Sequence, residues 1–174
     1  NFIFGENSRE ANRAFYETQL SPEEKQINLV AGLVNPDMAK VWGVDISHWD
    51  GNVQLDVTNG FGAAFVFSKA LDGTVRVNYF PANRDRARAA GMLHGPYGWL
   101  YRDANVSCKS QAQAADALLK QYPCDLPFVI DFEWTTYGGK QSNPNYTDLR
   151  IWVTEFLRLG NRKPILYSAA GFMN

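Results

Sequence analysis

From residue 41 onward, the order of hydrophobic and polar positions predicts short apolar strands that alternate with helices. Five strands are expected, at residues 42–47, 63–71, 94–101, 126–134 and 163–168. Helices are expected between them at residues 78–90, 107–122 and 147–160. In the last two of these helices apolar residues recur at helical spacing, which predicts one buried face for each.

This alternation predicts an α/β fold with a parallel sheet, either doubly wound or closed as a β/α (TIM-like) barrel. A nucleotide-binding doubly wound sheet carries a glycine-rich or phosphate-binding loop after its first strand, and no such motif follows residues 42–47. We therefore predict a β/α barrel, in which chemistry gathers at the carboxyl ends of the strands.

Residues 1–40 have a different pattern, which predicts two short helices at residues 8–20 and 21–34. Ser21 followed by Pro22 and Glu24 is typical of a helix start, and Asn35-Pro36-Asp37 ends the apolar stripe. We interpret residues 1–40 as a helical appendage or linker, although an extra layer on the main domain would fit equally well. The main domain is then residues 41–174.

Two carboxylates end the apolar run LPFVIDFEW at residues 126–134. Because side chains at i and i+2 of a strand point to the same face, Asp131 and Glu133 would project side by side. Asp45 and Asp72 lie at the ends of the first two predicted strands and would reach the same edge of the sheet. An acid after a strand can also be a helix cap or a solvated loop residue, so this segment alone leaves both interpretations open.

Composition narrows the possible partners. A net charge of −1 gives no electrostatic reason to expect nucleic acid, and no apolar run reaches the length of about 18 residues that a membrane span needs. His48 and His94 are the only histidines and form no Cys/His cluster, so neither a metal nor another cofactor is expected. Cys108 and Cys124 could be bridged or free.

Five segments occur in a recognisable order: GVDISHW, FVFSKALDG, AGMLHGPYGWL, LPFVIDFE and KPILYS. With them, residues 42–174 resemble the glycoside hydrolase family 25 lysozymes. The resemblance implies a modified β/α barrel with five β/α units followed by three further strands. It also implies a muramidase that hydrolyses the β-1,4 bond between N-acetylmuramic acid and N-acetylglucosamine in peptidoglycan.

The resemblance also implies roles for individual residues. Glu133 would be the general acid, and Asp131 would act as nucleophile or orient the 2-acetamido group of the substrate. Asp45 would help to tune the acid. Two like charges close together raise the pKa of one of them, so one carboxyl can hold a proton near neutral pH while its neighbour is ionised. The close spacing of the pair favours the retaining layout over the inverting one.

Four further residues are candidates for substrate binding. Tyr97 matches a tyrosine of the family's third strand and would contact sugar. Asp72 is either a cleft residue or part of an Asp-Gly turn. Trp49 and Trp134 would be stacking platforms at the mouth of the cleft or would pack at its rim. Ser47 and His48 are expected to shape the loop after the first strand rather than to act in catalysis.

Two departures from the family pattern stand out. Many relatives read Tyr-His-Phe on the third strand where this chain has Tyr97-Gly98-Trp99, so one side chain that could face the substrate is missing. The family's last three strands do not appear in these 174 residues, so the barrel is expected to be incomplete at its C-terminal end, with five β/α units.

The leading hypothesis is a peptidoglycan hydrolase within a larger lytic or phage protein, secreted or phage-associated and acting on bacterial cell walls. A lysozyme-like module that binds the wall without cutting it is the alternative. A chitinase-like glycosidase is a third, because an acidic pair at the end of a fourth strand recurs in β/α-barrel glycosidases.

Overall fold

The structure is a computed structural model that describes residues 42–60, 63–103, 105–137 and 140–169. The chain divides into two compact units, Asn1–Trp42 and Gly43–Asn174. The helices predicted at residues 8–20 and 21–34 lie outside the described residues. The features below belong to the second unit.

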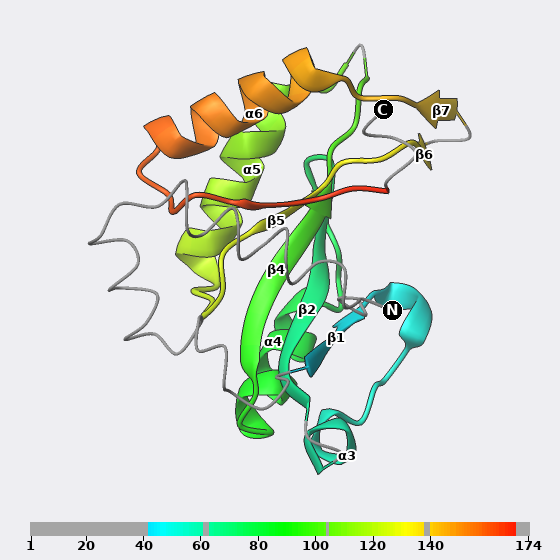
Figure 1. The fold of residues 1–174 in the computed structure, drawn as a ribbon, viewed down its shortest axis with the longest axis vertical. Coiled ribbons are helices and arrows are strands. Elements are labelled where there is room, and N and C mark those ends of the chain that lie inside the picture. The colour runs from blue at the N-terminus through cyan, green and yellow to red at the C-terminus, as the bar shows by residue number, and fades with distance from the viewer. Residues whose placement is uncertain (1–41, 61–62, 104, 138–139, 170–174) are drawn as a thin grey trace, which may run out of the picture. The chain divides into compact units, whose positions relative to one another are not determined.

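A parallel sheet forms the centre of this unit (Figure 1). Its strands lie in the order β1 (Trp42–Ile46), β2 (Ala63–Asp72), β4 (Leu93–Trp99), β5 (Val129–Asp131) and β8 (Ile165–Tyr167). Pairing is parallel from β2 through β4 and β5 to β8, while the short β3 (Val75–Arg76) pairs antiparallel with β2. The predicted α/β fold with a parallel sheet is confirmed.

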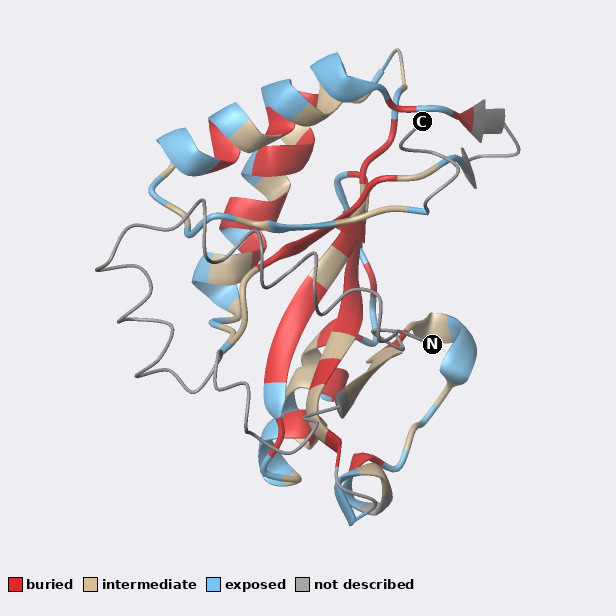
Figure 2. Ribbon diagram, in the orientation of Figure 1, coloured by how far each residue is buried: buried red, intermediate tan, exposed pale blue. Residues whose placement is uncertain are grey.

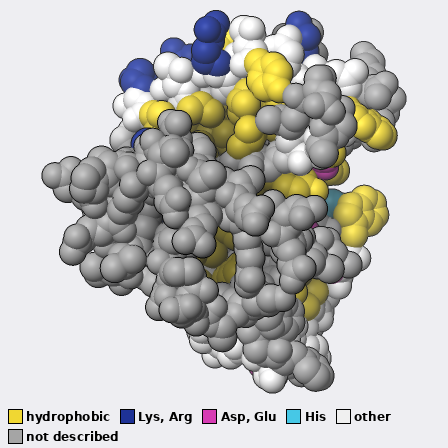
Figure 3. Space-filling model, viewed as in Figure 1, with side chains coloured by type: hydrophobic (Ala, Val, Ile, Leu, Met, Phe, Trp, Pro, Cys, Tyr) yellow, Lys and Arg dark blue, Asp and Glu magenta, His cyan; other side chains and the backbone are white. Residues whose placement is uncertain are grey.

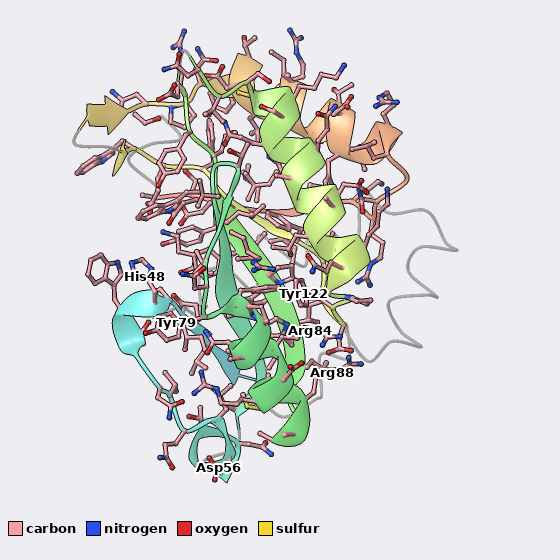
Figure 4. The ribbon with its side chains drawn as sticks, turned by 180° about the vertical axis from the view of Figure 1, so that it is seen from behind. His48, Asp56, Tyr79, Arg84, Arg88 and Tyr122 are labelled. Carbon is pink, nitrogen blue, oxygen red and sulfur yellow. The ribbon has the colours of Figure 1, made fainter. Side chains whose placement is uncertain are left out.

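Helices connect successive strands of the sheet. They are the 3-10 helix η1 (His48–Asp50), α3 (Leu55–Gly60), α4 (Phe80–Ala89), α5 (Cys108–Gln121) and α6 (Tyr146–Arg158). Local chemistry fixes where the long ones begin: the Ser107 hydroxyl accepts from the N–H of Ser110, and Asn145 forms a capping box with Asp148. Seen from behind, α4 and α5 lie in front of the sheet (Figure 4). No described helix is long and apolar enough to cross a membrane.

The three helices predicted after residue 41 and four of the predicted strands match the structure to within about three residues at each end. The strand predicted at residues 126–134 is wrong at both ends, because β5 covers only Val129–Asp131. The neighbouring strand β8 is equally short, so it offers β5 main-chain hydrogen-bond partners over only three residues. Between the predicted strand at residues 126–134 and the predicted helix at residues 147–160, β6 (Thr135–Tyr137) and β7 (Lys140–Ser142) form a hairpin that the sequence did not predict.

The apolar side chains are buried in two clusters (Figure 2). The larger one lies between the sheet and the helices α5 and α6, where the Phe128 ring lies 5.5 Å from that of Trp152 and 5.8 Å from that of Phe156. The smaller one joins β1 and β2 to α3 and α4. Burial of one such aromatic or aliphatic side chain contributes about 1.5–3 kcal/mol, so these clusters hold the helices on one face of the sheet.

A β-bulge interrupts β2 near its carboxyl end. Lys69 is paired with Tyr97 and Leu71 with Gly98, so β2 has one residue more than β4 at this point. Ala70 and Leu71 consequently both belong to the larger apolar cluster, although they are neighbours in the strand. Lys69 and Asp72 are left on the opposite face, where they form an ion pair.

His94 and Ser68 form a polar pair inside this otherwise apolar packing. The Ser68 hydroxyl lies 2.7 Å from Nε2 of His94, and both side chains are completely buried. Among the described residues, Nδ1 of His94 has no hydrogen-bond partner. Burial lowers the pKa of His94 to about 4, while Asp125 acts in the opposite direction and Arg84 and Arg88 add to the lowering.

We expect the stability of the fold to fall as the pH drops from 6.5 toward 4 because of His94. In that window the unfolded chain binds a proton at this histidine and the folded chain does not, so the contribution is complete above pH 6.5. The loss should be on the order of 3 kcal/mol, measured by urea unfolding at several pH values. His94→Gln should remove this part of the pH dependence and His48→Gln should not. Equal losses in wild type and His94→Gln would contradict the assignment.

The two cysteines are free thiols in the structure. Cys108 is the first residue of α5 and Cys124 follows the end of that helix, so roughly 20 Å of helix separates them, far beyond the Cα separation of about 7 Å that a disulfide tolerates. Burial raises the pKa of both thiols to about 11. Of the two states that the sequence left open, the folded chain therefore has the free thiols and not the disulfide.

We expect both cysteines to stay reduced and to react slowly with a thiol reagent at pH 8, since few thiolates are present. Labelling should become fast in denaturant, with two equivalents taken up. An intact mass lower by two hydrogen atoms than that of the reduced chain would show a bridge and contradict this prediction.

Candidate active site

Four acidic residues lie on or just after three strands, β1, β2 and β5, of the sheet shown in Figure 1. Asp45 lies on β1, Asp72 is the last residue of β2, Asp131 is the last residue of β5, and Glu133 follows two residues later. Parallel pairing from β2 through β4 and β5 to β8 brings the carboxyl ends of these strands to one edge, as the sequence predicted, and Asp45 on β1 is close enough to act on Tyr97 and Tyr167.

Main-chain hydrogen bonds fix the position of Asp131 on both sides. Asp131 is paired with Trp99 of β4 and with Tyr167 of β8. Its carbonyl accepts from the N–H of Leu100 at 3.1 Å. Beyond the strand, the N–H of Phe132 donates to the carbonyl of Tyr167 at 2.8 Å, and the Ser168 hydroxyl donates to the carbonyl of Phe132 at 2.6 Å. The segment that leads to Glu133 is thus held although it is no longer part of β5.

Asp131 is the carboxyl of the pair with a raised pKa. Its side chain is buried, which raises the pKa to about 8, and the charge of Glu133 adds to this rise. Lys69 and the indole of Trp99 act in the opposite direction. Burial therefore disfavours a negative charge on Asp131, the more buried acid of the two.

Two tyrosine hydroxyls lie within the field of these acids. The pKa of Tyr97 is raised by burial and then by the charges of Asp45 and Asp131. The pKa of Tyr167 is raised by burial and then by Glu133, Asp131 and Asp45. Both hydroxyls consequently stay protonated and can donate hydrogen bonds. The acids and Tyr97 thus lie close together, as predicted. Tyr167 lies near the same acids, although the sequence analysis did not name it.

Lys69, Trp99 and Tyr101 form a network behind the acids. The Lys69 ammonium lies 2.5 Å from Oδ1 of Asp72 and 3.7 Å from the centre of the Trp99 ring. The Tyr101 hydroxyl donates to the same Asp72 oxygen at 3.2 Å. Gln111 fixes Tyr101 in turn, because its side-chain amide bonds both the N–H and the carbonyl of that residue.

The predicted turn after Asp72 is present, with Gly73 at φ +60° between β2 and β3. Asp72 is half-buried and bound by Lys69 and Tyr101, so it serves the network whatever it also does toward a ligand.

Sequence reasoning missed Lys69, Tyr101 and Tyr167, and it treated Trp99 only as a departure from the family pattern. The available signal was the alternation of side chains along each strand: residues paired with Asp131 on the neighbouring strands point to the same face of the sheet as Asp131. Using that signal requires the register, which the sequence did not supply.

Gly98 does not leave a gap in the site. A Cβ atom placed on it would lie 3.0 Å from the Phe128 ring and 3.1 Å from Cβ of Leu71, and both of these belong to the larger apolar cluster. The position therefore faces the helices, while Tyr97 and Trp99 face the acids. The expectation that a substrate-facing side chain is missing at this position is wrong.

Trp49 and Trp134 are the two most exposed tryptophans that the structure describes, at 83% and 61%. Trp49 is part of η1, which begins at Ser47: the Ser47 hydroxyl accepts from the N–H of Trp49, and Asp50 accepts from the N–H of Ser47. The His48 ring lies 4.4 Å from that of Trp49 on the same helix (Figure 4). Ser47 and His48 therefore shape this loop, as expected. Trp134 directly follows Glu133.

Other surface features lie apart from the acids. A hollow of about 290 Å³ lies between α3 and the end of α4, and another of about 250 Å³ lies beneath the start of β5, lined by Leu126 and Pro127. On the face shown in Figure 3, Lys and Arg side chains lie over α6. Within the described ranges, no group of three or more His, Cys, Asp or Glu side chains could hold a metal ion.

Comparisons with known proteins agree on one family. The family model described as Glycosyl hydrolases family 25 matches residues 44–174. Lysozyme M1 of Streptomyces globisporus is 28% identical over 146 residues, which cover 79% of this chain and 49% of that protein. The chain thus spans about half the length of this curated relative.

Two solved structures show the same fold. The bacterial lysozyme from Streptomyces coelicolor has 26% identity and a TM-score of 0.63, over 79% of this chain and 67% of that one. A muramidase from Trichobolus zukalii has 27% identity and a TM-score of 0.62, over 76% and 67%. With the family model matching most of its length, this chain belongs to glycosyl hydrolase family 25.

Proposed function

We propose that this chain hydrolyses the β-1,4 bond between N-acetylmuramic acid and N-acetylglucosamine in peptidoglycan, with Glu133 and Asp131 as its acid pair. The observation that carries the proposal is the buried Asp131 carboxyl, which has a raised pKa and lies next to a second acid at the carboxyl edge of a parallel sheet. Two carboxyls that share a proton are the usual equipment of a glycosidase. Lysozymes and muramidases among the relatives favour peptidoglycan as the polymer.

The sheet belongs, in this proposal, to a β/α barrel with five β/α units in this chain. The strand order increases along the sheet without the reversal that marks a doubly wound fold, which supports a barrel. Right-handed crossovers then place every helix on the outside and leave the acids on the inner face.

Glu133 is the general acid. Catalysis uses the form of the pair in which Glu133 holds the shared proton and Asp131 carries the charge. Glu133 donates that proton to the glycosidic oxygen as the bond to the anomeric carbon breaks, and the Asp131 carboxylate stabilises the positive charge that develops there. Asp131 does this either by bonding to the anomeric carbon or by orienting the 2-acetamido group of the sugar. Glu133 then accepts a proton from the water that completes hydrolysis.

The surrounding residues bind the sugar chain. Asp45 adds negative charge near the acid pair, and Tyr97 is a neutral hydrogen-bond donor beside it. Trp49 and Trp134 offer exposed rings for stacking on sugar faces. Asp72 would contact sugar through the carboxylate oxygen that Lys69 and Tyr101 do not bind. This site would work outside the cell on bacterial walls, as part of a lytic or phage protein.

Replacing the acids should abolish activity without unfolding the chain. We expect Glu133→Gln to lower the rate of peptidoglycan hydrolysis by about 10²- to 10⁴-fold and Asp131→Asn to lower it as severely. The measurement is the release of reducing ends from purified cell walls, with circular dichroism as the check on folding. Asp85→Asn, on the exposed face of α4, is the matched control and should keep full activity.

Different outcomes would select among the hypotheses. A Glu133→Gln variant that is folded and fully active would refute the role of Glu133. Wild-type chain that sediments with cell walls but releases no reducing ends would favour a binding module. Faster cleavage of chitin oligomers than of peptidoglycan, judged by product masses, would favour the chitinase-like alternative.

Removing an exposed ring should weaken substrate binding but leave the chemical step intact. We expect Trp49→Ala to raise KM by about 3- to 10-fold with little change in kcat, because a stacked ring contributes roughly 0.5–1.5 kcal/mol. Leu93→Ala is the control, since this exposed side chain lies at the amino end of β4, away from the acids. An unchanged KM in Trp49→Ala would show that Trp49 does not contact the substrate.

A further inference from the structure

Two buried polar atoms near the acid pair lack partners. Among the described residues, neither Nε1 of Trp99 nor Oδ1 of Asp131 has a hydrogen-bond partner, although both atoms are fully shielded from solvent. The indole N–H can only donate, and the carboxyl oxygen can accept, most strongly when the carboxyl is ionised. Unpaired buried polar atoms are rare and costly in folded proteins, so a complementary pair of them requires an explanation.

The two residues are held side by side. Trp99 and Asp131 are partners in the β4–β5 ladder, and both side chains point to the face of the sheet that carries the acids. The Trp99 ring is fixed by Lys69, whose ammonium lies 3.7 Å from the ring centre, and by Tyr101, whose ring lies 6.3 Å away. The indole therefore has little freedom to turn its N–H elsewhere.

Charged and polar groups on several strands lie near Asp131, Tyr97 or Tyr167. Glu133 follows Asp131 on the same segment, Lys69 and Asp72 are on β2, Asp45 is on β1, and the neutral hydroxyls of Tyr97 and Tyr167 are on β4 and β8. Glu133 disfavours a charge on Asp131. Lys69 and the N–H of Trp99 favour it, and of these two only the N–H can form a directed bond from the neighbouring position on β4.

We propose that Trp99 is a positioning residue whose indole N–H donates to Oδ1 of ionised Asp131, and so decides which acid of the pair holds the shared proton. The inference rests on the proposed function of that pair. In the free protein burial disfavours the charge on Asp131, and the hydrogen bond from the Trp99 N–H to Oδ1 is not formed. When the Asp131 O–H bond breaks and the proton passes to Glu133, the charge left on Asp131 is taken up by the Trp99 N–H and the Lys69 ammonium.

A phenylalanine at this position would fill the same space without an N–H. The Tyr-His-Phe pattern expected from the family resemblance has one there, so the tryptophan gives this chain an extra donor at its acid pair. Because the bond is stronger with the charged acid than with the neutral one, it favours the form of the pair in which Glu133 is ready to protonate a substrate.

The test is the pH dependence of hydrolysis in Trp99→Phe. Without the donor, ionised Asp131 is less stable, so the alkaline limb of the pH–rate profile should move to higher pH by about one unit and the maximal kcat should fall about tenfold. KM should change little. Trp152→Phe makes the same chemical change in the core beneath α6 and should leave both limbs in place.

A Trp99→Phe profile with an unshifted alkaline limb would overturn the proposal, even if the rate fell, because lost packing alone does not move a pH profile. Equal shifts in Trp99→Phe and Trp152→Phe would overturn it as well.

A second measurement does not depend on activity, and its main readout uses the wild-type protein. In wild-type protein the indole ¹⁵N–¹H resonance of Trp99 should shift with pH at the same midpoint as the Asp131 carboxyl carbon, and this titration should vanish in Asp131→Asn. A Trp99 resonance that does not move between pH 5 and pH 10 would overturn the proposal, even in an active enzyme. Wild-type protein that shows this coupled titration but does not cleave peptidoglycan would refute the proposed function and leave the Trp99 bond standing.

Discussion

The burial of the Asp131 carboxyl is the constraint on which the site depends. A charged carboxylate in a shielded position is expensive, so the group keeps its proton well above the pH at which a free aspartic acid loses it. The backbone holds the carboxyl in this position, because the hydrogen bond to Leu100 and the pairing with Trp99 and Tyr167 fix the main chain of Asp131. A single fixed strand end thus sets the protonation of the whole pair.

The cation nearest to this carboxyl is itself unusual, since Lys69 is almost fully buried. It tolerates burial because Asp72 neutralises it and the Trp99 ring covers it. The arrangement leaves Lys69 only partly available to Asp131, which explains why its influence does not cancel the effect of burial. The acid site and the aromatic network behind it therefore act as one electrostatic unit.

The sequence predicted the site better than it predicted the contacts within the site. Asp45, Asp131 and Glu133 could be grouped because carboxyl ends of parallel strands meet at one edge, a rule that needs no coordinates. Trp99, Lys69 and Tyr167 could not be added, because their closeness to Asp131 depends on which residues pair across strands and on one extra residue in β2. Likewise, LPFVIDFEW reads as one long strand, yet a strand ends where its neighbours end, and that length is a property of β8.

The irregularity in β2 has a further consequence for how this strand is read. Before it, the even-numbered residues Val66 and Ser68 face the helices. After it, the odd-numbered Leu71 does, and Asp72 has moved to the other side. Even-numbered residues thus face the helices before Ala70, and odd-numbered residues face them after it. An alignment that matches β2 to an uninterrupted strand will be correct on one side of Ala70 and inverted on the other, assigning the lysine or the aspartate to the wrong face.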